Sequence, residues 1–364
     1  MSDAQSDAAA AYVAAFAGEG AGRYIANLET EVRLHRWGAH LMPLTVNNDS
    51  AGRTFVCSPR VGFIDFAREE LVHFPSPALR LPLRALISAM ELVLRPAQLE
   101  RIVHVNNWMM STNLPRKLEP GLASEQTQQL IEEYPTHILA MRSLNRRHSA
   151  PLMEALERAG WTLVPARQVF ILDDVERQAF STSDGKADAR LWRKSQLRHE
   201  VLKQISSAEA DQIIALYEGL YRQKYSKLNP AYTPDFVHLT HRLGLMTYHV
   251  LRNEADKICA SGGFMSNGRH CAMPLLGYDL SAPRKDGLYR LICHAASCLA
   301  AQDRLSYNKS SGVGQFKRNR GASPEIEYTA FYVRHLSQRR RQPMRMLSFV
   351  GHRIGTPILQ RYTL

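Results

Sequence analysis

The sequence lacks any apolar run long enough to cross a membrane. A membrane-spanning helix needs about 20 predominantly apolar residues. The best candidate, residues 81–96 (LPLRALISAMELVLRP), is interrupted by Arg84 and Glu91. The amino terminus opens with acidic residues, where a secretory signal would carry positive charge. Both absences favour a cytoplasmic location.

Cysteine is scarce and unpaired in its spacing. The five cysteines include no C-x-x-C pair, and their odd number argues against a disulfide framework or a zinc site. We therefore expect no metal. Cys293 and Cys298 fall on one predicted helix, where small buried thiols are common. The sequence also has no G-x-S-x-G elbow, which argues against a serine nucleophile.

Acidic residues are absent after Glu327, whereas seven arginines follow it. The whole chain carries a formal net charge of +12. A positive surface attracts nucleic acid, a nucleotide-containing cofactor, an acidic carrier protein or anionic lipid. A solvated basic tail is the simpler alternative. The charge alone does not choose between these partners.

The length and composition indicate a globular protein with two domains. The hydrophobic content of 45% is typical of a globular protein. A chain of 364 residues is too long for one typical core and suits two. The order helix, strands, helix, strand, short helix, strand recurs in both halves and predicts an α/β fold with mixed sheets. We expect an amino-terminal domain over residues 1–180, a linker at 181–187 (STSDGKA), a second domain over 188–335 and a basic helical tail over 336–364.

The stretch from Gly287 to Tyr332 is the most informative part of the chain. Apolar residues at helical spacing after Gly287 predict a helix packed on a sheet. A short strand over 305–311, a glycine-bounded turn rich in cations and a strand over 325–333 follow. Glycines and cations where the chain turns suit a fold that binds an anionic carrier.

This stretch resembles the carboxyl half of GNAT-type acyltransferases, in particular the double-domain branch with the Fem-type aminoacyltransferases. The succession GLYR, SS, FK, RG and EY and the pair Phe316-Lys317 carry the resemblance. It implies two tandem GNAT-like domains, with the active site in the second. It further implies an N-acyltransferase that moves an acyl group from a coenzyme A or acyl carrier protein thioester to an amine. A Fem-type transferase that uses aminoacyl-tRNA and a non-catalytic binding module stay open as alternatives.

The resemblance also assigns residues to the donor site. Arg284 and Gly287 match the first and fourth positions of the phosphate-binding R/Q-x-x-G-x-G/A pattern, whereas Tyr289 replaces its final small residue. Lys317 would contact the donor and the developing oxyanion, with Phe316 packing beneath the donor. A second cation, Arg318, would extend the positive surface. No tightly bound cofactor is implied, because the carrier is a co-substrate.

Further candidates come from the segments around this stretch. Ser310 and Ser311 end a strand where the backbone can approach a ligand closely, so we interpret them as donor-binding residues. Tyr278 could protonate a leaving group, and Asp279 could orient an amine or take its proton, although it could equally form a turn.

The acceptor would lie under the loop KYSKLNPAYTP, which is aromatic, cationic and proline-punctuated. Tyr225 and Lys227 are the acceptor-binding candidates in this loop, with a plain interhelical loop as the alternative.

The basic tail contains an amphipathic pattern. Met346, Leu347, Val350 and Ile354 recur at intervals that place them on one helical face. Such a stripe either docks on the protein's own core or makes peripheral contact with an anionic membrane. We expect docking on the core.

Overall fold

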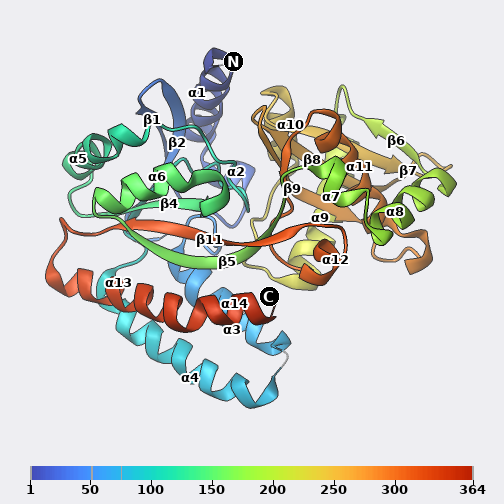
Figure 1. Cartoon of the computed structure of the whole chain (residues 1–364). Helices are drawn as coiled ribbons and strands as arrows, with labels where there is room; N and C mark the ends of the chain where they lie inside the picture. Colours follow the sequence, from blue (N-terminus) through green and yellow to red (C-terminus); the bar gives the residue numbers. More distant parts are fainter. Residues whose placement is uncertain (1, 51, 75, 363–364) are drawn as a thin grey trace. The chain divides into compact units, whose positions relative to one another are not determined.

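The chain divides into two compact units in the computed structural model, which describes residues 2–50, 52–74 and 76–362 (Figure 1). Unit 1 comprises Met1–Gly22, Asn27–Gln168 and Glu325–Leu364, and unit 2 comprises Arg23–Ala26 and Val169–Pro324. Both units combine helices with strands, so the predicted α/β class is confirmed. The breaks differ from the expected segments, because the chain from Glu325 onward belongs to unit 1.

Unit 1 is built on a mixed sheet with the strand order β1-β2-β3-β4-β11-β5. Strands β3 and β4 are parallel, whereas β11 runs antiparallel to β4. Strands β5 and β11 each cross the boundary between the units along the chain. The strands are β1 (Glu31–Trp37), β2 (His40–Asn47), β3 (Ile102–Val105), β4 (Ile138–Asn145), β5 (Thr162–Leu172) and β11 (Ser323–Tyr332). The helices and short turns are α1 (Ser2–Glu19), α2 (Ala21–Tyr24), η1 (Val61–Asp65), α3 (Phe66–Glu70), η2 (Leu71–His73), α4 (Pro77–Leu94), η3 (Arg95–Ala97), η4 (Pro120–Leu122), α5 (Ala123–Glu133), α6 (Arg146–Arg158), α13 (Gln338–Val350), η7 (Gly351–Gly355) and α14 (Thr356–Tyr362).

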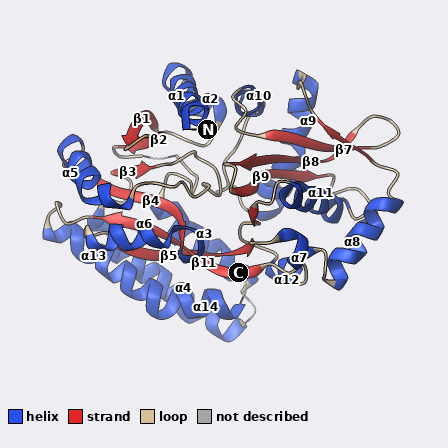
Figure 2. Ribbon diagram, turned by 45° about the horizontal axis from the view of Figure 1, so that its top comes forward, coloured by secondary structure: helices blue, strands red, loops and turns tan. Residues whose placement is uncertain are grey.

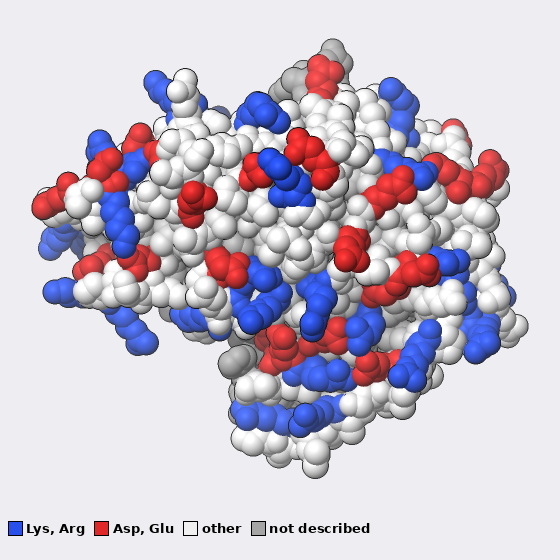
Figure 3. Space-filling view, turned by 180° about the vertical axis from the view of Figure 1, so that it is seen from behind, with Lys and Arg blue, Asp and Glu red and all other residues white. Residues whose placement is uncertain are grey.

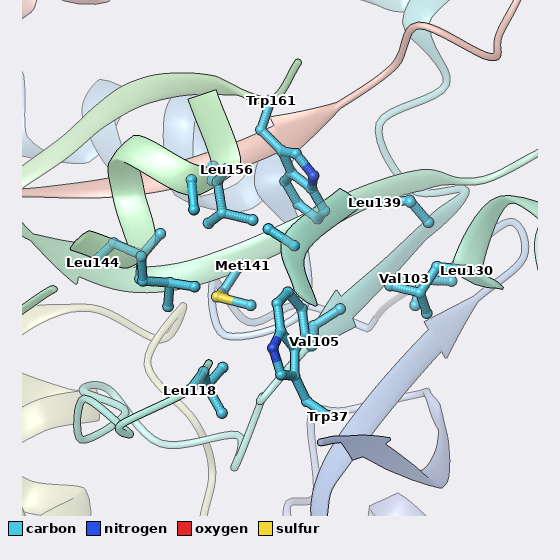
Figure 4. Close-up of a cluster of buried hydrophobic side chains, with 14 of the residues drawn as sticks. Trp37, Val103, Val105, Leu118, Leu130, Leu139, Met141, Leu144, Leu156 and Trp161 are labelled. Carbon is cyan, nitrogen blue, oxygen red and sulfur yellow. The ribbon is translucent and has the colours of Figure 1, made fainter. Parts of the chain in front are cut away.

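Alternate residues of β4 face two different cores, as the two-residue repeat of a strand requires. Leu139 and Met141 join the cluster under α5 and α6, which also buries Trp37 and Trp161 (Figure 4). Ile138 and its alternate neighbours pack instead with α4 and α13. Helices therefore cover both faces of this sheet, with α5 and α6 on one and α4 and α13 on the other (Figure 1).

Unit 2 is built on strands in the order β5-β10-β9-β8-β7-β6. Only β9 and β10 pair in parallel among its described strands. The added strands are β6 (Arg198–Val201), β7 (Thr247–Arg252), β8 (Ile258–Ser266), β9 (His270–Tyr278) and β10 (Ser306–Asn308). The helices and short turns are α7 (Val175–Ala179), α8 (Ser183–Lys194), α9 (Ser207–Tyr217), η5 (Glu218–Tyr225), α10 (Pro234–Arg242), η6 (Arg284–Asp286), α11 (Leu288–Gln302) and α12 (Gly314–Arg318).

Glycines in β8 and β9 let helices approach both faces of this sheet. A Cβ on Gly277 would lie 2.4 Å from the backbone of Leu216 in α9. A Cβ on Gly262 would face the opposite way, 3.5 Å from Ile292 of α11 and 2.4 Å from the sulfur of Met273. Helices α9 and α10 thus cover one face, and α11 with α7 and α8 covers the other (Figure 2).

The predicted linker at 181–187 is wrong, because it forms the start of helix α8. The Thr182 hydroxyl accepts a hydrogen bond from the Gly185 amide and caps this helix. A Cβ on Gly185 would lie 2.0 Å from the Ala179 carbonyl oxygen, so the glycine allows the chain to turn tightly between α7 and α8. Turn-rich composition marked a helix start rather than a flexible connection.

The carboxyl-terminal helix docks on unit 1 with part of its predicted stripe. Leu347 is buried against α4, and Val350 is partly buried there. Met346 and Ile354 are exposed instead, and Met344 of α13 is buried in the core beside Leu347. Among the described residues, no helix combines the length and apolar character needed to span a membrane.

Candidate functional site

Two neighbouring strands of unit 2 separate at the centre of the sheet. β10 pairs with β9 only from Ser306 to Asn308, opposite residues 270–272. Beyond Asn308 the chain stays with β5, since the Lys309 amide donates to the Phe170 carbonyl at 2.8 Å. β9 continues to Tyr278 paired with β8, and no partner is described for its other edge. This separation leaves residues 273–278 of β9 without a described strand partner on the side of β10.

The loop that leaves β10 holds an unusual backbone conformation. Ser310 and Val313 have φ angles of +58° and +44°, in a region that non-glycine residues rarely adopt. The side chain of Asn308 accepts a hydrogen bond from the Ser310 amide at 2.8 Å and so ends the strand. The strand is therefore shorter than the predicted 305–311. Such backbone strain is concentrated at functional sites in proteins.

Lys309 stands at the point of separation with its side chain buried. It is 9% exposed, and its ammonium lies 4.8 Å from the centre of the Tyr307 ring. No described residue forms a hydrogen bond or an ion pair with this ammonium. Burial lowers the pKa of Lys309 below its usual value, while the Cys293 thiol and Asp188 oppose the shift weakly. Sequence reasoning missed this residue, although it directly precedes the two serines that were singled out.

Lys317 lies in α12 and reaches back to the loop after β10. Its Nζ donates hydrogen bonds to the carbonyl oxygens of Ser310 at 3.0 Å and Ser311 at 2.6 Å. The side chain is 4% exposed, and its Nζ lies 5.6 Å from the centre of the Phe170 ring. Lys317 thus fixes the shape of the strained loop. Arg318 lies over the same ring at 5.6 Å.

A buried ionic network joins the segment that follows α12 to helices α8 and α11. Arg320 contacts Asp188 of α8 through Nε at 2.5 Å, and Arg290 of α11 contacts the same carboxylate at 2.6 Å. The Arg320 guanidinium also lies 3.5 Å from the centre of the Phe316 ring. Asp188 was not predicted, because its partners are more than 100 residues away in the sequence.

Aromatic side chains continue from Phe316 toward the end of β9. The Tyr289 ring lies 4.9 Å from Phe316 and 5.7 Å from Tyr278, measured between ring centres. Tyr221 of η5 is partly buried, and desolvation raises its pKa above the usual value, as it does for Tyr289. The structure therefore brings together three sequence-predicted residues, Tyr278, Tyr289 and Phe316.

The Cys293 thiol lies among these tyrosines and lysines. Burial raises the pKa of Cys293, although the positive charges of Lys309 and Lys317 act in the opposite direction. A buried thiol that stays protonated is a poor nucleophile. The arrangement does not favour Cys293 as an attacking group.

Asp279 is engaged outside this aromatic group. Its carboxylate accepts hydrogen bonds from Lys257 at 2.8 Å and from the Ser281 hydroxyl at 2.6 Å. These contacts, led by the one with Lys257, lower the pKa of Asp279 to about 2. A carboxylate with so low a pKa is a weak base, and the turn-forming alternative describes its contacts well.

The amino end of α11 is formed by Gly287, whose φ of +65° suits glycine. A Cβ at Gly287 would lie 2.5 Å from the Leu191 side chain of α8, so this position is tightly packed. Arg284 lies in the preceding turn η6 and is exposed. Their assignment to a phosphate-binding site stays a prediction.

The acceptor candidates lie at the surface of unit 2. Tyr225 ends η5 with 53% of its surface exposed, and its ring lies 6.2 Å from that of Tyr221. Lys227 is exposed, and its carbonyl oxygen accepts a hydrogen bond from Arg222 at 2.7 Å. Tyr225 thus extends the aromatic group outward, whereas Lys227 does not join it.

No family model and no curated protein matches this sequence. Among solved structures, the chain is similar to FemX, with a TM-score of 0.49, 7% identity and coverage of 63% of this chain and 80% of that one. It is similar to L-PGS from Bacillus licheniformis, with a TM-score of 0.47, 13% identity and coverage of 64% and 79%. A GCN5-related N-acetyltransferase from Kribbella flavida matches with a TM-score of 0.35, 12% identity and coverage of 63% and 80%. Fem-type and GNAT-type proteins, the classes that the sequence resembles, are both among its structural neighbours.

Proposed function

We propose that this chain is an N-acyltransferase that moves an acyl group from a thioester of coenzyme A or of an acyl carrier protein to an amine. The observation that supports this proposal is the separation of β9 from β10 beside the buried ammonium of Lys309. The two units would each be a GNAT-like domain, with the active site in unit 2.

The edge of β9 that β10 leaves suits an extended, amide-containing carrier arm. Beyond residue 272 this edge has no described strand partner, so its backbone could pair with an amide-containing ligand, except at the nitrogen of Pro274. An extended ligand can pair with such an edge as an added strand does. Tyr278 and Tyr289 would pack along the arm, and Arg284 with the amino end of α11 would face its phosphates.

Lys309 would move the proton that amide formation releases. The amine nitrogen attacks the carbonyl carbon, the carbon–sulfur bond breaks and the carrier leaves as a thiol, so the amine must lose a proton. A lysine whose pKa is lowered by burial gives up its own proton more readily than an exposed lysine, and its neutral form can accept the proton of the amine. Lys317 would act mainly by holding the 310–311 loop. Its direct contact with the donor carbonyl stays a prediction.

Mass spectrometry of acyl transfer provides the test. The purified chain is incubated with a panel of acyl thioesters and amines, and amide products are sought alongside release of the thiol. Lys309→Met should lower turnover by about 10²–10⁴-fold, the usual contribution of a positioned acid or base. Lys285→Met is the matched control, because Lys285 is exposed in the nearby turn η6.

The same screen separates the alternatives. Transfer from aminoacyl-tRNA and not from thioesters would replace the proposed donor by that of a Fem-type transferase. Binding of carriers without turnover of any donor would contradict catalysis and favour the binding module. Equal turnover by Lys309→Met and wild type would remove Lys309 from the mechanism.

A further inference from the structure

An unusual concentration of exposed apolar side chains lies on one part of unit 1. Helix α4 exposes Leu79, Leu81, Leu92 and Val93, with Leu81 and Leu92 at 76% and 62%. The adjoining segments expose a second group, which consists of Val72 of η2, Met346 and Phe349 of α13 and Ile354 of η7. Helices α4 and α13 contact each other, and Tyr362 of α14 packs on Phe74 beside η2. We call this set of residues the α4–α13 surface.

The outward face of α4 is apolar, which a soluble helix normally avoids. A helix at a protein surface usually carries polar residues on its outer side. In α4 the exposed positions from Leu81 onward are Leu81, Pro82, Arg84, Ala85, Ser88, Ala89, Leu92 and Val93. Only one of these is charged. The acidic Glu91 lies on the flank of the helix, where Arg60 and Arg68 occupy its carboxylate at 3.0 and 2.8 Å.

Unpaired arginines border these apolar residues. Arg84 lies on α4, and Arg339, Arg345 and Arg353 lie on or directly after α13; all four are exposed. No described carboxylate forms an ion pair with any of them. In Figure 3 the lowest edge of the molecule, where α4 lies in Figure 1, is white and blue. The α4–α13 surface is therefore apolar and positively charged at once.

A small cavity lined by arginines opens along α13. It has a volume of about 110 Å³, and its lining includes Arg334, Arg341 and Arg345 over an apolar floor of Val164, Phe331 and Val333. The Nε of Arg341 is buried without a hydrogen-bond partner among the described residues. The volume is several times what one ordered water needs. Guanidinium groups around a cavity of this size suit a phosphate, which arginine binds through paired hydrogen bonds.

We propose that the α4–α13 surface binds an anionic phospholipid bilayer, with its leucines and phenylalanine in the interface and a lipid phosphate in the arginine-lined cavity. Apolar side chains on helices that lie flat enter the boundary between headgroups and acyl chains, and flanking arginines are attracted to anionic lipid. A protein partner would need carboxylates opposite the arginines and apolar residues opposite the leucines. A bilayer of anionic phospholipid supplies both features over any area.

Vesicle sedimentation with the full chain tests this proposal. Vesicles of phosphatidylglycerol and phosphatidylcholine in equal parts should bind the protein, and vesicles of phosphatidylcholine alone should bind it much more weakly. Added salt should weaken the binding. Leu81→Glu combined with Leu92→Glu should reduce binding more than ten-fold, because burying even one leucine side chain accounts for a factor of that size. Leu34→Glu is the control, since Leu34 is 43% exposed on β1 away from these helices.

The arginines are tested separately from the leucines. Arg341→Gln and Arg345→Gln should each reduce binding about five-fold on the anionic vesicles. Arg269→Gln, an exposed arginine after β8, should leave it unchanged. Circular dichroism of each variant checks that it folds.

Three results would overturn the proposal. The first is equal binding to both kinds of vesicle, and the second is unchanged binding by the double leucine variant. The third is a wild-type dimer that the leucine substitutions dissociate without any vesicle binding, which would assign the surface to a second copy of this chain. None of these readouts depends on acyl transfer, so the outcome is independent of the proposed function.

Discussion

Replacing Lys309 by methionine should make the protein more stable at neutral pH while it removes most of the proposed activity. Methionine keeps the unbranched apolar stem of lysine and removes the ammonium, which has no described hydrogen-bond partner in a residue that is 9% exposed. A buried charge without a partner costs stability. The substitution should therefore relieve that cost with little loss of packing.

The size of the effect depends on pH in a defined direction. Burial lowers the pKa of Lys309 from its ordinary value of 10.5, so between the folded-state pKa and 10.5 the unfolded chain binds a proton that the folded chain does not. Stability of the wild type therefore rises with pH across this window. The cost is complete below the folded-state pKa and disappears above 10.5. Each unit of pKa depression corresponds to about 1.4 kcal/mol.

Urea unfolding from neutral to alkaline pH measures this difference. The gap between Lys309→Met and wild type should be largest at neutral pH and should close as the pH approaches 10.5. Lys285→Met reports the effect of losing an exposed lysine. A gap that does not change with pH, or a methionine variant less stable than wild type at neutral pH, would refute the argument from burial.

Three further substitutions test the framework of the molecule. Asp188→Asn removes the carboxylate that Arg290 contacts and leaves Arg320 with Asp184 alone, so it should cost about 3–5 kcal/mol in urea unfolding. Asp49→Asn, at an exposed pair with Arg101, should cost about 1 kcal/mol or less, and equal costs would show that burial of the network adds nothing. Gly287 and Gly244 both have a positive φ, but only a Cβ at Gly287 would meet Leu191. Gly287→Ala should therefore lower the melting temperature more than Gly244→Ala, and equal shifts would rule out a packing constraint at the start of α11. Burial lowers the pKa of His104 to about 3, so between pH 6.5 and 3 the unfolded chain binds a proton that the folded chain does not, and stability should fall as the pH falls. His104→Asn should reduce this pH dependence of stability, and a variant with the same dependence as wild type would exclude His104 as its cause.

The sequence predicted those parts of the site that depend on local pattern. The helix after Gly287 and strand β11 follow from apolar spacing. Helix α11 begins at Leu288, and β11 lies within two residues of the predicted strand over 325–333. Tyr289 and Phe316 were named from a short motif, and their rings meet. These features are determined by residues that are close in the chain.

The parts that were missed depend on distant segments. Lys309 pairs with Phe170 of β5, which lies more than 100 residues earlier in the chain, so its local sequence does not indicate that it is buried. Asp188 was not singled out, because its partner Arg320 lies 132 residues away. The return of β11 to unit 1 was also unforeseen, since nothing in its own residues names β4 as its partner.

The position of β11 between β4 and β5 has a consequence for the order in which the two units fold during synthesis. β4 and β5 emerge early, but the strand that separates them emerges only after all of unit 2. During that interval the edges of β4 and β5 have no partner from β11, and the core under α4 lacks Phe331, Met344 and Leu347. Unit 2 is complete once Pro324 has left the ribosome. Synthesis of this protein therefore favours folding of the second unit before the first, the reverse of the usual amino-terminal-first order.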